Sequence, residues 1–171
     1  MIIKNYEGKT PVVDGGFVAE DVSLIGDVKI GKNASIWYGV VLRGDVDSII
    51  IGENTSIQDN SVAHCATDIP TIIGDNCVVG HNAVIHSCTV EEGCLIGMGA
   101  VLLDGCHIGK GSIVAAGSVV SPGKVIPPNS MVMGVPGRVV RELTEADTEG
   151  TRLSVQHYIH YAQAQLAQYH I

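Results

Sequence analysis

The sequence predicts an all-β solenoid, in which short strands wind around three flat sides, followed by one C-terminal α-helix. Aliphatic residues recur every six positions along most of the chain, often followed by Gly, as in IGKNAS, IGENTS and IGKGSI. A six-residue period does not follow one face of an α-helix, which repeats every ~3.6 residues, but it is a multiple of the strand period of two. The composition agrees, because 21 residues are Gly and only 4% are aromatic, which suits a core of small branched side chains.

The hexapeptide repeat covers residues 18–137 and sets the size of the solenoid. Three hexapeptides make one coil, so the repeats predict about six coils, stacked ~4.8 Å apart as in any β-ladder. The six-residue spacing is interrupted three times. Three extra residues lie between repeat positions 42 and 51, four lie between 63 and 73, and the step from 85 to 90 is one residue short. We expect the extra residues to form loops at corners. The repeat positions are Val18, Leu24, Ile30, Ile36, Leu42, Ile51, Ile57, Ala63, Ile73, Val79, Ile85, Val90, Ile96, Leu102, Ile108, Val114, Val120, Ile126 and Val132.

The pattern changes after GVPGRVV (134–140), which predicts a solenoid domain over 1–140 and a helical segment over 141–171 packed against it. Thr144, with Asp147 three residues later, is typical of a helix N-cap. Apolar residues then follow at helical spacing, which indicates an amphipathic helix on the side of the solenoid. These residues are Val155, Tyr158, Ile159, Ala162, Leu166 and Tyr169.

The charge and the cysteines narrow the class of protein. A net charge of −8 disfavours nucleic acid and anionic membranes as partners, and nowhere do ~18 apolar residues run uninterrupted. Five cysteines without a CxxC pair argue against a disulfide framework. Cys77, Cys94 and Cys106 fall in a slot that small residues fill in other repeats, so we expect them to be small buried residues. The sequence indicates a soluble cytoplasmic protein.

Two histidines fall in the same slot of adjacent coils. Counting sides by threes places Leu42, Ala63, Ile85 and Leu102 on one side of the solenoid. The residues that follow them are Arg43, His64, His86 and Leu103. His64 and His86 should therefore face outward from neighbouring rungs, ~4.8 Å apart.

This placement suits a metal ion such as Zn²⁺. Two nitrogens that bind a tetrahedral Zn²⁺ lie roughly 3.4 Å apart, which imidazoles on adjacent rungs can reach. A third histidine, His81, lies around a convex corner, where its side chain should diverge from His64 and His86. We expect a neighbouring chain to supply it, and a three-sided prism forms a trimer by cyclic symmetry. His107 is expected to have no direct role.

The motifs LRGD (42–45), QDN (58–60) and GHNAVIH (80–86), together with His64, resemble the γ-class carbonic anhydrase family of hexapeptide-repeat proteins. The resemblance implies a left-handed parallel β-helix and a homotrimer. It also implies that His64 and His86 bind the metal from one subunit and His81 from the next. The ending GVPGRVV is less specific, because hexapeptide acyltransferases share it.

The resemblance assigns roles to five further residues. Gln58 would position the metal-bound water or the substrate. Arg43, Asp45 and Asp59 would form a polar network across the trimer interface, and a salt bridge of Arg43 and Asp59 between subunits is the simpler interpretation. Tyr158 corresponds to a tyrosine near the family's site, with a core aromatic as the alternative.

The leading hypothesis is a lyase that hydrates CO2 to bicarbonate with a metal-bound hydroxide. Zn²⁺ is the expected cofactor, although Fe²⁺ and Co²⁺ also accept imidazole ligands. One feature departs from the best-studied members, which carry an acidic loop whose glutamate ferries protons. Between His64 and His81 the only acidic residues are Asp68 and Asp75.

Two alternatives stay open. One is an acyltransferase or thioesterase that acts on coenzyme A thioesters. Acyltransferases of this fold use one histidine as a base, and the sequence shows no other nucleophile beside a base except Cys65, which follows His64. The other alternative is a metal-binding scaffold without catalytic activity.

Overall fold

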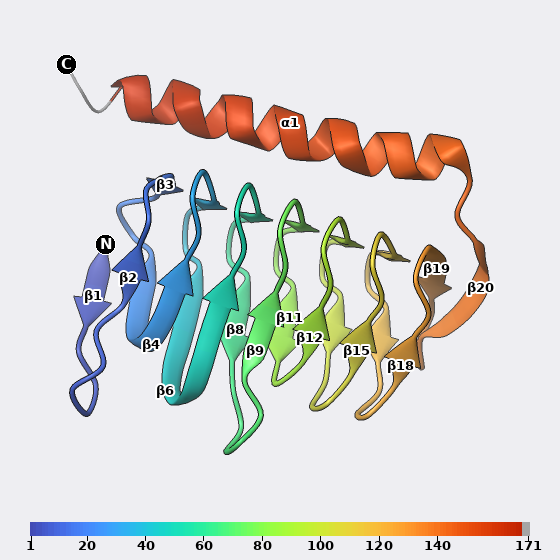
Figure 1. The fold of residues 1–171 in the computed structure, drawn as a ribbon, viewed down its shortest axis with the longest axis horizontal. Helices are drawn as coiled ribbons and strands as arrows, with labels where there is room; N and C mark the ends of the chain where they lie inside the picture. Colours follow the sequence, from blue (N-terminus) through green and yellow to red (C-terminus); the bar gives the residue numbers. More distant parts are fainter. Residues whose placement is uncertain (169–171) are drawn as a thin grey trace.

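The computed structural model describes residues 1–168 and confirms the predicted solenoid with one C-terminal helix (Figure 1). The chain winds as a left-handed parallel β-helix of about seven turns, one more than predicted. Two strands of the extra turn come from residues before Val18, the first repeat position. There, β1 (Ile2–Lys4) and β2 (Val12–Val13) pair in parallel with the two halves of β4 (Ser23–Ile30). Because the predicted repeat positions begin only at Val18, counting them gives one coil too few.

The solenoid has three flat faces, which we name by what lies on them. The helix face is covered by the C-terminal helix and consists of parallel strands, one from each coil. An antiparallel strand, β20 (Arg138–Glu142), closes its end. The parallel strands are β3 (Phe17–Val18), β5 (Ser35–Ile36), β7 (Ser56–Ile57), β10 (Val78–Val79), β13 (Leu95–Ile96), β16 (Ile113–Val114) and β19 (Ser130–Met133).

The other two faces share their first strands, because β4 and β6 (Val41–Ile51) pass around the corner between them. The histidine face carries the first halves of these strands, with β1, β8 (Val62–His64), β11 (Val84–His86), β14 (Val101–Leu102) and β17 (Val119–Val120). The third face carries their second halves, with β2, β9 (Thr71–Ile73), β12 (Thr89–Val90), β15 (His107–Ile108) and β18 (Val125–Ile126).

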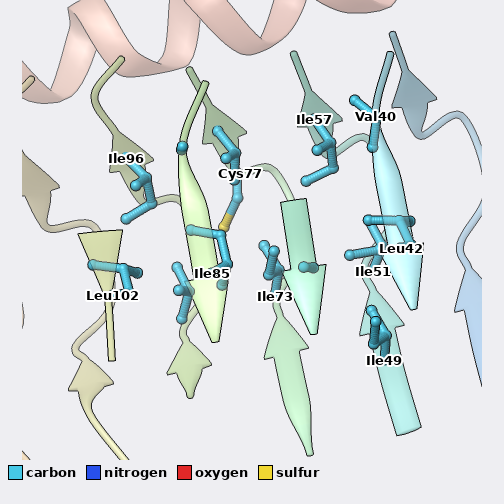
Figure 2. Close-up of a cluster of buried hydrophobic side chains, with 14 of the residues drawn as sticks. Val40, Leu42, Ile49, Ile51, Ile57, Ile73, Cys77, Ile85, Ile96 and Leu102 are labelled. Carbon is cyan, nitrogen blue, oxygen red and sulfur yellow. The ribbon is translucent and has the colours of Figure 1, made fainter. Parts of the chain in front are cut away.

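The repeat residues fill the interior and confirm the predicted register. Leu42, Ala63, Ile85 and Leu102 pair in sequence across β6, β8, β11 and β14. Figure 2 shows side chains from successive coils stacked in the interior of the solenoid. Every repeat residue exposes at most 2% of its surface except Val18, which lies in the first coil and is partly buried. The five cysteines are free and buried, as expected for Cys77, Cys94 and Cys106.

Helix α1 (Glu145–Gln168) begins beside the last coil and runs back along the helix face (Figure 1). Thr144 and Asp147 cap it reciprocally, since each backbone N–H donates to the other's side chain, at 2.7 and 3.3 Å. Val155 and Ala162 are buried, and Tyr158 and Leu166 pack against the core. Tyr169 lies outside the described residues. The division of the chain after residue 140 remains a prediction.

Within residues 1–168, no helix combines the length and the apolar character needed to cross a lipid bilayer.

Candidate functional site

His64 and His86 occupy the same rung position on adjacent strands of the histidine face, as predicted. They end β8 and β11 and pair with each other, and Arg43 of β6 precedes them in the same row. In each strand, the residue before the histidine points inward and fills the core, namely Ala63 or Ile85. Because strand residues alternate between faces, both imidazoles point out of the solenoid.

The two imidazoles approach each other edge to edge. His64 Nδ1 lies 3.1 Å from His86 Nε2, and the side chains expose 19% and 30% of their surface. The remaining ring nitrogens contact carboxylates: His64 Nε2 lies 3.1 Å from Asp45, and His86 Nδ1 lies 2.5 Å from Asp104. A carboxylate accepts hydrogen bonds, so a neutral imidazole in each pair can donate its single N–H to the aspartate.

The donor set fits a divalent metal ion. When each neutral imidazole donates to its aspartate, His64 Nδ1 and His86 Nε2 both present lone pairs, and lone pairs 3.1 Å apart repel unless a positive charge lies beside them. Two imidazole nitrogens on one tetrahedral Zn²⁺ lie roughly 3.4 Å apart. The spacing therefore suits two ligands of one metal ion, with carboxylates at the outer nitrogens as in many zinc sites.

Arg43 and Asp45 support this pair from the preceding coil. The Arg43 guanidinium contacts the Asp45 carboxylate at 2.7 Å. Partial burial would raise the pKa of Asp45, but hydrogen bonds from Arg43 and His64 outweigh it and hold that pKa below its usual value. Asp45 is thus an anionic acceptor for His64 at neutral pH. Its contacts lie within one chain, and a network of Arg43 and Asp45 with a second subunit remains a proposal.

His81 lies at the opposite edge of the histidine face, at the corner that follows β10. Its Nδ1 contacts Asp59 Oδ2 at 2.8 Å, which leaves Nε2 available as a ligand. Asp59 belongs to the equivalent corner one coil earlier, where its carbonyl accepts the Asn82 backbone N–H. Within one chain, Asp59 therefore pairs with His81, whereas Arg43 pairs with Asp45.

Tyr158 lies beside His81, whereas Gln58 is buried under α1 next to Asp59. Both line a hollow of about 220 Å³ under α1, and Tyr158 also lines a hollow of about 390 Å³ with Asp59 and His81. Burial, and then the nearby Asp59 carboxylate, raise the pKa of Tyr158, so its phenol stays protonated at neutral pH. Its ring also packs against Trp37, at 5.8 Å between centroids. Both interpretations of Tyr158, site residue and core aromatic, are compatible with this position.

The predicted site residues thus form two groups at opposite edges of one face. The first group contains Arg43, Asp45, His64 and His86, and the second contains Gln58, Asp59, His81 and Tyr158. Among residues 1–168 of a single chain, no three His, Cys, Asp or Glu side chains are arranged to hold a metal ion. A three-histidine site requires a second chain to bring the two groups together.

Asp104, in the turn after β14, contacts His86, and the sequence analysis did not predict this contact. The available signal was its position: Asp104 is an acidic residue two positions after Leu102, and Leu102 pairs with Ile85, the residue before His86. Cys65 is fully buried, and its thiol lies 3.2 Å from the carbonyl of Asp47. Burial raises the pKa of this thiol, which disfavours the thiolate that a nucleophile needs.

Comparison with known proteins places this fold and these motifs in one family. Models of the bacterial transferase hexapeptide (six repeats) and of the hexapeptide repeat of succinyl-transferase match residues 87–122 and 48–87. A protein of Methanocaldococcus jannaschii named "Probable carbonic anhydrase" is 49% identical over 142 residues, which cover 83% of this chain and 89% of the relative.

Two further relatives match over most of the chain. A Geobacillus kaustophilus protein named carbonic anhydrase is 45% identical over 147 residues, covering 85% of this chain and 81% of the relative. The crystal structure of a hexapeptide transferase family protein from Anaplasma phagocytophilum has a TM-score of 0.92 at 40% identity and covers 95% of this chain and 97% of that one. With such identity over nearly the whole solenoid, this chain belongs to the γ-carbonic anhydrase-like family of hexapeptide-repeat proteins.

Proposed function

We propose that the protein is a metal-dependent carbonic anhydrase, which hydrates CO2 to bicarbonate at sites between the subunits of a homotrimer. The observation that carries this proposal is the pair of imidazole nitrogens 3.1 Å apart, each backed by a carboxylate at its other nitrogen. The names of the relatives that cover most of the chain support the same activity.

The histidine face supports assembly through its two edges. Along each coil His81 comes first, then an outward valine, then His86; one coil earlier the order is Asp59, Val62, His64. The outward positions of this face form a row of valines, of which Val62 and Val84 each expose 37% of their surface. A second subunit that covers this apolar row would bring its own His81 edge toward His64 and His86. Repeating the same contact three times closes a ring.

Within such a site each residue has a defined task. His64 and His86 of one subunit and His81 of the partner subunit would hold the metal, which when bound supplies the Lewis acidity that makes water a nucleophile near neutral pH. Asp45, Asp59 and Asp104 keep one nitrogen of each imidazole occupied as a donor. Gln58 would orient the water or CO2 through its amide, and Tyr158 would donate a hydrogen bond from its protonated phenol.

Removal of the proton from the site is the step for which this chain has the fewest suitable acidic residues. Of the two acidic residues between His64 and His81, Asp75 accepts the backbone N–H of Glu53, and Asp68 lies in the loop that follows β8. We expect external buffer to carry protons away from the site, so turnover should rise with imidazole concentration at fixed pH and ionic strength. CO2 hydration should also rise with pH through an apparent pKa near ~7.

Stopped-flow CO2 hydration by the fully metallated, reduced trimer over a wide buffer range tests this proposal. The wild type should exceed the His86→Ala protein at every buffer concentration, and the difference should grow with buffer. Equal rates for the two proteins throughout the range would rule out the anhydrase assignment.

A coenzyme A acyltransferase or thioesterase is the second candidate. The descriptions of both matching family models and the name of the similar Anaplasma structure refer to transferases. Against it, the thiol next to His64 is buried with a raised pKa. Turnover of acetyl coenzyme A by metal-free protein, without CO2 hydration by metallated protein, would favour this candidate. Metal binding with neither activity would favour a non-catalytic scaffold.

A further inference from the structure

Three histidine–carboxylate pairs surround the two halves of the proposed site. Asp45 lies beside His64 Nε2, Asp59 beside His81 Nδ1, and Asp104 beside His86 Nδ1. In each pair the acid comes from a neighbouring coil, so the stacking of the solenoid itself brings the two side chains together. Each pair occupies the ring nitrogen that would not bind a metal.

We infer that Asp104 is a positioning residue, which fixes the tautomer and ring orientation of His86 for metal binding; this inference rests on the proposed function. The polar contacts of the His86 ring are to Asp104 at 2.5 Å and to His64 at 3.1 Å. If Nδ1 donates to Asp104, Nε2 is the unprotonated nitrogen, and it faces His64. A neutral imidazole with Nε2 protonated instead would turn a donor toward the metal position and could not bind.

Exposure separates this role from a purely structural one. Within one chain the Asp104 side chain is 46% exposed and that of His86 is 30% exposed, so removing this contact should have little effect on the folding of the chain. Carboxylates that hold metal-ligating histidines typically change metal affinity by about 10- to 100-fold when they are removed. A loss of metal affinity without a loss of stability would identify positioning.

The chain provides a matched control on the third face. Glu91 contacts His107 Nε2 at 2.8 Å, and both side chains are 39% exposed. This pair has the same chemistry and similar exposure, but neither residue belongs to the proposed site. Glu91→Gln should therefore remove the carboxylate that contacts His107 without changing metal binding at His64, His81 and His86.

The experiment measures Zn²⁺ affinity by competition with a chelator, and thermal unfolding of the metal-free protein, for the wild type, Asp104→Ala, Asp104→Asn and Glu91→Gln. We expect Asp104→Ala to weaken Zn²⁺ binding about 10- to 100-fold. Asp104→Asn, which keeps an acceptor oxygen, should lose less, and Glu91→Gln should bind as the wild type does. Metal-free Asp104→Asn should unfold at nearly the wild-type temperature. Wild-type affinity in both Asp104 variants would overturn the inference.

A second measurement applies even if the wild type binds no Zn²⁺ and the proposed function fails. The ¹⁵N shifts of the His86 ring in the metal-free protein, at a pH where it is neutral, report which nitrogen carries the proton. Protonation at Nδ1 in the wild type, shifting toward Nε2 in the Asp104→Asn and Asp104→Ala proteins, supports the role of Asp104. An unchanged tautomer in both variants contradicts it.

Discussion

A histidine binds a metal through the ring nitrogen that carries no proton, so the partner of its other nitrogen decides which one is available. In this chain Asp45, Asp59 and Asp104 contact His64 Nε2, His81 Nδ1 and His86 Nδ1, and among residues 1–168 the opposite nitrogens have no carboxylate partner. The opposite nitrogens of His64 and His86 already lie 3.1 Å apart. Of the three proposed ligands, His81 is the one that does not approach these two nitrogens within a single chain.

Replacement of any one of His64, His81 or His86 by Ala should severely weaken metal binding. Each removes one of three ligands, whereas His107→Ala removes a histidine whose Nε2 contacts Glu91 on the third face. Metal content per chain, measured by elemental analysis after dialysis, should be about one for the wild type and for His107→Ala, since three equivalent sites serve a trimer. Full occupancy in the His81→Ala protein would refute the proposed ligand set.

The sequence predicted the stacking of His64 and His86, because rung position follows from counting inward residues. It did not predict Asp104, since counting placed Leu103 in the histidine row and gave no direction for the turn that follows. The sequence also did not predict which residues Arg43 and Asp59 contact within one chain. Side chains at corners can point along either adjoining face, and only the folded structure brings Arg43 to Asp45 and Asp59 to His81.

At the scale of elements, the corners explain why the repeat keeps its register. Asn33, Asn54 and Asn76 adopt φ values of 57°, 57° and 54°, a left-handed conformation that Asn tolerates better than most residues. Their side-chain amides form a row of hydrogen bonds, at 3.3 Å between the first two and 3.1 Å between the last two. Such corners stack the coils in line, and the same regularity aligns His64 with His86.

The junction of β20 with α1 should respond to pH. Hydrogen bonds from Arg141 and then Thr144 lower the pKa of Asp147 well below its usual value. A carboxyl group whose pKa is depressed on folding stabilises the folded state above its unfolded pKa of ~3.9, and this contribution is lost as the pH falls through the folded value. Asp147→Asn should therefore lower the unfolding temperature modestly at pH 7, since the pair is exposed.

Thermal unfolding of both proteins at constant ionic strength checks this expectation. The difference between wild type and Asp147→Asn should narrow as the pH falls from ~4 toward ~2. A difference that stays constant over this range would mean that the charge of Asp147 does not contribute.

The six-residue period predicted nearly every strand of the solenoid, and Thr144 with Asp147 predicted where α1 starts. The period could not show which face the helix covers, because it is the same on all three. Aromatic residues mark that face: Phe17 and Trp37 lie 5.0 Å apart between ring centroids, and Tyr158 of α1 packs on Trp37. Nor could the period reveal the first coil, whose strands β1 and β2 are joined by a long connection without a repeat.

On the scale of the whole molecule, the proposed site is divided between the two edges of one flat face. His64 and His86 lie at one edge and His81 at the other, with outward valines between them. A flat face cannot bring its own edges together, but identical faces arranged around a threefold axis can place unlike edges side by side. In the proposed trimer, the geometry of the solenoid would therefore link metal binding to assembly.

Mixed trimers test this link. A His64→Ala chain and a His81→Ala chain should each fail to bind metal alone. When the two are refolded together, some interfaces unite an intact His64 and His86 with an intact His81 of the partner subunit, so part of the metal binding should return. No recovery despite demonstrated subunit exchange would mean that the ligands come from a single chain.

The most direct measurement is an anomalous difference map at the zinc absorption edge, from crystals of the full chain grown with Zn²⁺. We predict one peak per chain, bound by Nδ1 of His64 and Nε2 of His86 from one subunit and by His81 of the partner subunit. A map without a peak between His64 and His86, or a peak there whose protein ligands all come from one chain, would contradict the shared site.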